Sequence, residues 1–201
     1  AKIKDKIIYL PNYYPQDFKT KKKKSGEYID VACFGAIRPL KNQVLQAVAA
    51  LQFANKIGKK LRFHINSGRV EMQGGPVLNN LKAMFEHLSE QGHELVNHQW
   101  TPREQFLELC SQMDIGMQCS FSETFNIVAA DLVSQGVPIV VSSEVPWSTP
   151  AFAAIPTETS DIVDKLIKAY KYRWLNAYLG QKNLKIYTNN TKKVWLKYFK
   201  G

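Results

Sequence analysis

The sequence predicts an α/β fold, a Rossmann-like doubly wound parallel sheet in a single domain. From Glu27 to Gly180, apolar runs of strand length alternate with stretches of helical periodicity. This order is typical of a parallel sheet with helices on both faces. Polar, glycine-containing segments follow the predicted strands, so we expect them to meet at the carboxyl edge of the sheet, where ligands bind. We predict three regions: a lead-in strand with a basic loop (1–26), the Rossmann-like domain (27–160) and C-terminal helices (161–201).

The first half of the domain is assigned from apolar spacing and from glycines. Two stretches have apolar residues at helical spacing, and Gly58 and Gly92 follow them at positions that suit a helix end. Short apolar runs between these stretches predict strands. The expected elements are a strand at 28–34, a helix at 42–57, a strand at 61–65, a polar loop at 67–75, a helix at 77–91 and a strand at 94–98.

The second half begins at Thr101-Pro102-Arg103-Glu104, where a cap residue is followed by Glu three positions later. This signature predicts a helix that ends near Met113. A strand at 115–118, a helix at 125–135 and a strand at 138–141 follow. Residues 160–199 predict two aromatic-rich helices broken near Gly180 and Gln181. Their aromatic side chains fit either a surface that faces another domain or ordinary core packing.

The net charge of +10 is unevenly distributed along the chain. Residues 1–24 carry a net charge of +6 and residues 165–201 carry +10, whereas residues 25–164 carry −6. A fold that binds nucleic acid carries its basic residues on the fold itself, so we expect no nucleic acid partner. The basic run at 19–24 fits a solvated loop, or contact with an anionic membrane surface or an acidic partner.

The sequence indicates a cytoplasmic protein. Cys33, Cys110 and Cys119 are odd in number and lack Cys-x-x-Cys spacing, which favours reduced thiols. No apolar run reaches the roughly 20 residues of a membrane span, and no secretory signal opens the sequence. Any membrane contact is therefore expected to be peripheral. The first residue is Ala1, which indicates processing or a fragment of a longer protein.

The turn after the first predicted strand contains the first candidate site residues. Gly35 ends the strand and lets the backbone pass close to a ligand, and Arg38 and Lys41 follow before a helix. Cations at this position suit a diphosphate, although a pair of exposed charges is the simpler interpretation. The chain contains neither a Gly-x-x-x-x-Gly-Lys-Ser/Thr loop nor a Gly-x-Gly-x-x-Gly turn, which argues against an ATPase and a dehydrogenase.

The second candidate segment places Glu123 and Asp131 eight positions apart across the start of a predicted helix. Eight residues rise about 12 Å along a helix and leave the two acids within roughly 80° of one face. The helix N-terminus between them offers free N–H groups and partial positive charge, which suits phosphate. A first-turn carboxylate alone would explain Glu123. Asp131 lies among apolar residues, where an acid indicates a hydrogen-bonding partner or a ligand.

Together these segments resemble the donor-binding half of a GT-B glycosyltransferase of the family-4 type, over about residues 7–178. The segments that carry the resemblance are 35–41, Trp100-Thr101-Pro102, Glu123-x7-Asp131 and the run Gly-Val-Pro-Ile-Val-Val at 136–141. Enzymes of this type retain the anomeric configuration and use nucleoside-diphosphate sugars without a metal ion. The resemblance implies a transferase that uses hexose-type donors, and it implies no metal and no cofactor besides the donor substrate.

The resemblance also implies a role for each site residue. Glu123 would contact hydroxyls of the donor sugar, Asp131 would hold the ribose hydroxyls, and the basic residues would grip the diphosphate. Catalytic roles fall on Glu123, Arg38 and Lys41. The expected donor-binding residues are Gly35, Arg38, Lys41, Glu123, Thr124, Phe125, Asn126 and Asp131.

The sequence departs from the family pattern at three positions. Asp131 stands where the family has Glu, Ala36 stands where an Arg is common, and Thr124-Phe125-Asn126 stands where Gly-Phe-Gly is usual. The chain also has no room for the N-terminal domain that binds the acceptor in this family, so we expect that domain elsewhere. Two alternatives stay open: a binding module that docks on nucleic acid or anionic membrane through its basic ends, and a nucleotide-sugar epimerase.

Overall fold

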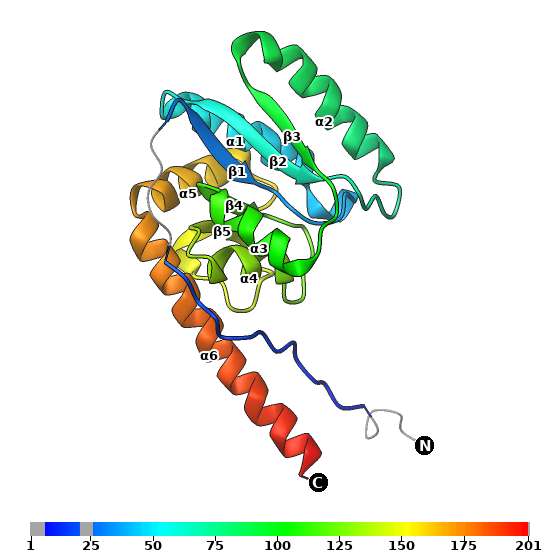
Figure 1. Ribbon diagram of the computed structural model, residues 1–201, viewed down its shortest axis with the longest axis vertical. Helices are drawn as coiled ribbons and strands as arrows, with labels where there is room; N and C mark the ends of the chain where they lie inside the picture. The colour runs from blue at the N-terminus through cyan, green and yellow to red at the C-terminus, as the bar shows by residue number, and fades with distance from the viewer. Residues whose placement is uncertain (1–6, 21–25, 201) are drawn as a thin grey trace.

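A six-stranded parallel sheet forms the core of the computed structural model, which describes residues 7–20 and 26–200 (Figure 1). The strand order is β3-β2-β1-β4-β5-β6, the order of a doubly wound nucleotide-binding sheet. The chain reverses its direction of winding between β1 and β4, which lie side by side. The predicted fold class is therefore confirmed. The strands are β1 (Tyr28–Ala32), β2 (Lys60–Asn66), β3 (Glu94–His98), β4 (Ile115–Gln118), β5 (Ile139–Ser142) and β6 (Ala153–Ala154).

Helices cover both faces of the sheet, because alternate strand residues point to opposite sides. Ile29 and Val31 join the core under α1, α2 and α5, whereas Ala32 and Phe34 join the core under α3, α4 and α6. Figure 1 shows α3 and α4 in front of the sheet and α1 behind it. The α-helices are α1 (Gln43–Lys56), α2 (Gly75–Leu88), α3 (Arg103–Gln112), α4 (Ile127–Ser134), α5 (Thr159–Lys171) and α6 (Arg173–Phe199), with 3-10 turns η2 (Pro39–Lys41), η3 (Ser89–Gln91) and η4 (Pro150–Phe152).

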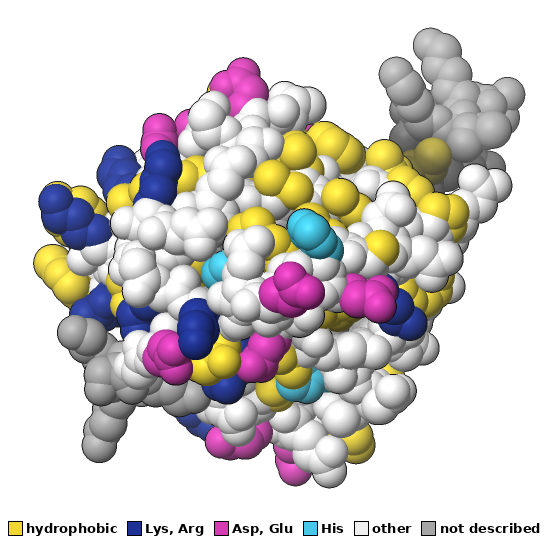
Figure 2. Space-filling view, turned by 90° about the horizontal axis from the view of Figure 1, so that it is seen from above, with side chains coloured by type: hydrophobic (Ala, Val, Ile, Leu, Met, Phe, Trp, Pro, Cys, Tyr) yellow, Lys and Arg dark blue, Asp and Glu magenta, His cyan; other side chains and the backbone are white. Residues whose placement is uncertain are grey.

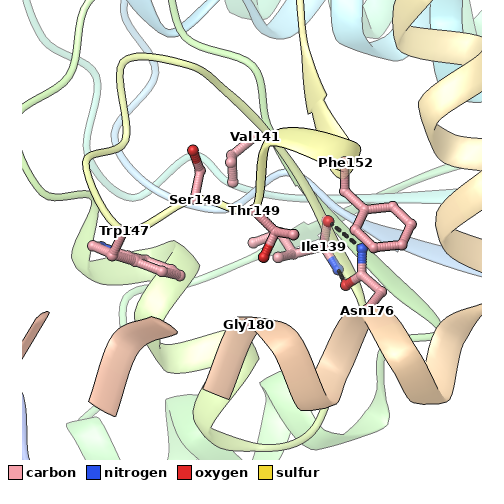
Figure 3. A pocket seen from close by; sticks show the side chains of 8 residues that line it. All are labelled: Ile139, Val141, Trp147, Ser148, Thr149, Phe152, Asn176 and Gly180. Carbon is pink, nitrogen blue, oxygen red and sulfur yellow. Dashed lines mark hydrogen bonds between the residues drawn. The ribbon is translucent and has the colours of Figure 1, made fainter. Parts of the chain in front are cut away.

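The predicted break near Gly180 and Gln181 is wrong, because the C-terminal helices separate at Tyr172 and α6 runs through both residues. Gly180 serves close packing instead: a Cβ there would lie 3.3 Å from Val133 of α4. One turn earlier, the Asn176 amide donates to the Ile139 carbonyl (2.9 Å) and accepts from its N–H (2.7 Å). Figure 3 shows this pairing beside a small cavity of about 10 Å³ between β5 and α6.

The N-terminal segment runs beside α6 (Figure 1). The Trp195 indole donates to the Pro11 carbonyl (2.9 Å), and the Lys19 N–H donates to the Ser134 carbonyl of α4 (2.7 Å). Residues 7–20 contain no strand, so the predicted lead-in strand is wrong for the described part of this segment. Lysines 21–24 of the basic loop lie outside the described residues. The division of the chain into three regions stays a prediction.

The surface carries charged side chains of both signs (Figure 2). Figure 2 shows one face, on which basic and acidic side chains lie interspersed among hydrophobic ones. Trp174, Tyr178, Tyr198 and Phe199 of α6 are exposed, so ordinary core packing does not account for these aromatic residues. Among the described helices, none is long and apolar enough to cross a membrane.

Candidate functional site

A cleft of about 460 Å³ opens where the carboxyl ends of β1 and β4 meet. The turn after β1 and the loop after β4 form two of its walls, because adjacent parallel strands end at the same edge of the sheet. All but one of the predicted site residues line this cleft, namely Gly35, Arg38, Lys41, Glu123, Thr124, Phe125 and Asn126. The structure thus brings these residues together, while their roles stay predictions.

Lys41 and Glu123 form an ion pair at the floor of the cleft. Their side chains are only 11% and 9% exposed, respectively. Gly35 turns the chain out of β1 with a φ of 108°, a conformation that favours glycine. The 3-10 turn η2 then brings Lys41 against the loop after β4. A ligand anion that binds Lys41 would compete with Glu123 for this ammonium group.

Asn126 stands where the enzymes that the sequence resembles usually have glycine, and it suits this position. Its backbone lies in the left-handed region (φ 59°), which Asn tolerates better than most residues. Its side-chain oxygen caps α4 by accepting from the Ala129 N–H (2.9 Å), as N-cap residues do. Its amide nitrogen donates to the Glu123 carboxylate (3.0 Å) and to Gln118 (3.1 Å). Asn126 therefore fixes both the helix N-terminus and the acid.

Arg38 lies at the rim of the cleft beside the loop after β2. Its guanidinium approaches the Glu71 carboxylate at 3.8 Å, and Glu71 also pairs with Arg69. The buried Arg38 Nε has no hydrogen-bond partner among the described residues. Arg69 lies 5.9 Å from the ring centroid of Trp100, a cation–π distance. Three cationic side chains therefore line the cleft, Arg38, Arg69 and Lys41.

Asp131 lies in a second cavity of about 230 Å³, which shares Gly35, Trp100, Ile127 and Val128 with the first. Asp131 is buried, and its partners come from within the chain. Its Oδ1 accepts from the Tyr14 hydroxyl (2.8 Å) and from Arg103 Nη2 (2.9 Å). Burial raises the pKa of the Asp131 carboxyl, although the bonds from Tyr14 and Arg103 oppose that shift.

Replacing Asp131 with Asn should change how stability depends on pH. Because the pKa of Asp131 is raised in the folded state, its ionised form opposes folding at neutral pH, and this cost is relieved as the pH falls through the folded-state pKa. An amide does not titrate. The wild type should therefore gain stability relative to Asp131→Asn between about pH 7 and about pH 4 in urea unfolding. A constant difference would contradict a raised pKa.

Sequence reasoning missed Tyr14, Arg69, Glu71 and Arg103 as site residues. Arg69 and Glu71 lie in the loop that was expected at this edge, so their charge was the available signal. Arg103 carried a weak signal because it begins α3 next to the Trp100-Thr101-Pro102 motif. Tyr14 carried none.

The predicted absence of a metal site stays a prediction. No group of three or more His, Cys, Asp or Glu residues that could hold a metal occurs in the described part of the chain. Cys33, Cys110 and Cys119 are free and buried, and burial raises the pKa of each thiol. The thiols are therefore poor nucleophiles at neutral pH.

Comparison with known proteins finds similarity in three-dimensional structure. No protein-family model matches the sequence, and no curated protein matches it. A structure of trehalose-6-phosphate synthase aligns with a TM-score of 0.70 at 12% identity, covering 87% of this chain and 45% of that chain. TarM from S. aureus, in complex with UDP and two other ligands, aligns with a TM-score of 0.63 at 16% identity, covering 96% of this chain and 38% of that chain.

The chain has the fold of one half of a GT-B glycosyltransferase. It spans less than half the length of these two proteins. The catalytic domain of cholesterol-α-glucosyltransferase from Helicobacter pylori aligns with a TM-score of 0.61 at 14% identity, covering 80% of this chain and 99% of that chain. The expected likeness to GT-B enzymes is confirmed for the fold, and the family-4 type stays a prediction.

Proposed function

We propose that this GT-B half binds the donor of a retaining glycosyltransferase, a nucleoside-diphosphate hexose. One observation carries the proposal: the cleft places Lys41, Arg38 and Glu123 together at the N-terminus of α4. Among the solved structures with a similar fold, one described as trehalose-6-phosphate from E. coli contains UDP-2-fluoro glucose, and the TarM structure contains UDP. A ligand with an anionic centre and hydroxyl groups at one end fits the charges of the cleft.

Each part of the proposed donor faces protein groups of complementary chemistry. The diphosphate suits the α4 N-terminus, where backbone N–H groups and the helix dipole favour anions. Lys41 and Arg38 add positive charge there, and Arg offers a fork that matches phosphate oxygens. The Glu123 carboxylate accepts hydrogen bonds from sugar hydroxyls. The nucleoside then occupies the adjoining cavity that contains Asp131.

The transfer reaction breaks the bond between the anomeric carbon and the diphosphate oxygen. Negative charge develops on the departing diphosphate while the sugar becomes oxocarbenium-like. Preorganised cations and helix N–H groups stabilise this charge more than they stabilise the ground state, which lowers the barrier. Lys41, Arg38 and the α4 N-terminus supply that stabilisation, so the proposed mechanism requires no metal ion.

The acceptor site is proposed to lie on an N-terminal domain that this chain does not contain. Trehalose-6-phosphate synthase and TarM are more than twice the length that the chain covers in them. The exposed aromatic residues Trp174, Tyr178 and Phe199 on α6 offer a surface for such a domain.

We also propose that the enzyme is cytoplasmic and that its basic ends make peripheral contact with an anionic membrane. The chain alone would bind the donor and turn it over slowly.

Thermal unfolding against nucleoside diphosphates and their sugar conjugates tests the donor proposal. A ligand that binds only the folded chain stabilises it by about 2.7 kcal/mol at 100 times its Kd. We expect one base to raise Tm above the others, with the sugar conjugate and the free diphosphate both active. Heparin and anionic vesicles serve as controls for binding that depends on negative charge alone.

Stabilisation by polyanions alone, lost in high salt, would support the binding-module alternative and contradict the donor proposal. Epimerisation of the donor sugar, detected by product analysis, would support the epimerase alternative.

A further inference from the structure

Arg103 lines the second cavity and forms an ion pair with the buried acid Asp131. The side chain begins α3, and its Nη2 lies 2.9 Å from Asp131 Oδ1 and 3.1 Å from the Tyr14 hydroxyl. Its guanidinium also lies 5.5 Å from the centroid of the Tyr14 ring. Three segments far apart in the sequence, the N-terminal segment, α3 and α4, therefore meet at one point.

The two charged side chains of this group differ in what they offer to a ligand. The Arg103 side chain is 47% exposed, whereas the Asp131 side chain is 5% exposed. Oδ1 of Asp131 already accepts two hydrogen bonds. A guanidinium carries five N–H donors, and within the described residues only Nη2 of Arg103 has a hydrogen-bond partner. Arg103 therefore presents donors to the cavity, while Asp131 is largely covered.

The other walls of this cavity suit a nucleoside. Trp100 and Phe106 supply aromatic surface, and Thr101 supplies a hydroxyl. The cavity adjoins the cleft that contains Lys41 and Arg38, with Gly35 and Val128 lining both. A ligand with its diphosphate in that cleft would place its nucleoside here.

We propose that Arg103, rather than Asp131, binds the ribose hydroxyls, by donating hydrogen bonds to their oxygens. This inference rests on the proposed function. Asp131 and Tyr14 act as positioning residues, because they hold the guanidinium toward the cavity. The shorter acid at position 131 is consistent with this arrangement, since it pairs with Arg103 inside the protein instead of reaching the ligand.

Calorimetry with UDP, 2′,3′-dideoxy-UDP and pyrophosphate tests the assignment. The same comparison with ADP, GDP and their dideoxy forms covers the other bases. Arg103→Gln should lower nucleoside diphosphate affinity about tenfold and leave pyrophosphate affinity unchanged. The wild type should bind the dideoxy nucleotide more weakly than the parent nucleotide, and this difference should vanish in Arg103→Gln. It should persist in Asp131→Asn, whose amide oxygen can still accept from Arg103, and Tyr14→Phe should lose less affinity than Arg103→Gln.

Arg62→Gln provides the matched control, because Arg62 is a partly exposed arginine of β2 that pairs with Glu94 and lines neither cavity. A dideoxy penalty that persists in Arg103→Gln and vanishes in Asp131→Asn would overturn the inference in favour of the acid. Equal losses for pyrophosphate and nucleotides would place Arg103 on the phosphates and overturn it too. Pyrophosphate binding without nucleotide preference also contradicts it. If neither pyrophosphate nor any nucleotide binds, the proposed function itself fails.

Discussion

Replacing Lys41 with Met should weaken the binding of pyrophosphate and of nucleoside diphosphates by about 10- to 100-fold. This range corresponds to the free energy that a hydrogen bond to a charged group usually contributes. Lys41 is the most enclosed cation of the cleft, with 11% of its side chain exposed. Its charge is therefore little screened by water. Isothermal titration calorimetry on the folded variant measures the loss. Unchanged affinity would remove the main support for a diphosphate in this cleft.

The same substitution also leaves Glu123 without its cation, so stability and binding have to be separated. Asn126 still donates to the acid, which limits the expected loss to about 1–3 kcal/mol in urea unfolding. Combining Lys41→Met with Glu123→Gln should restore stability but not affinity. Lys60→Met is the matched control, because Lys60 pairs with Glu27 at an exposed site and should change neither quantity appreciably.

The fold was predictable because its signals are local and repeated. The strands β1 and β2 carry buried apolar residues, β3 carries Leu95 and Val96, and Gly58 and Gly92 both follow helices in left-handed conformations. The doubly wound topology then follows from the order of the elements. Strand β6, with only Ala153–Ala154, is too short to have a periodicity of its own.

The main cleft was predictable for a topological reason. Lys41 and Glu123 are 82 positions apart, yet both follow strands that are neighbours at the point where the winding reverses. A parallel sheet brings such loops together whatever lies between them in the sequence. Sequence reasoning therefore placed Lys41 and Glu123 at one site without knowing that they form an ion pair.

The surroundings of Asp131 were not predictable in the same way. An acid among apolar residues of α4 indicated a partner or a ligand, but the pattern does not distinguish them. Tyr14 is 117 positions away and belongs to a segment without regular structure, whose path depends on side-chain contacts along α4 and α6. The predicted helix break near Gly180 and Gln181 was wrong for a related reason, since Gly180 provides close packing on Val133 and not a helix end.

Replacing Gly74 with Ala should destabilise the protein by about 2–4 kcal/mol. A Cβ at this position would lie 2.1 Å from the Ile37 carbonyl oxygen and 3.0 Å from that of Glu71. These are backbone atoms that hydrogen bonds fix in place: the Ile37 N–H donates to Arg69 (2.9 Å), and the Glu71 N–H donates to Ile37 (2.9 Å). The loop would have to move away from Ile37.

That movement would also reach the cleft, because the same loop sets Glu71 and Arg69 beside Arg38. Gly75→Ala is the matched control one residue later. A Cβ on Gly75 meets nothing within 4 Å, and Gly75 is the first residue of α2, where the gain in helix propensity from Ala is small and the following Pro76 opposes it. Urea unfolding should therefore show a change of less than about 1 kcal/mol for Gly75→Ala and a clear loss of stability for Gly74→Ala. Equal stabilities would show that the loop is not held against Ile37, and the positions of Arg69 and Glu71 in the cleft would then lose their structural basis.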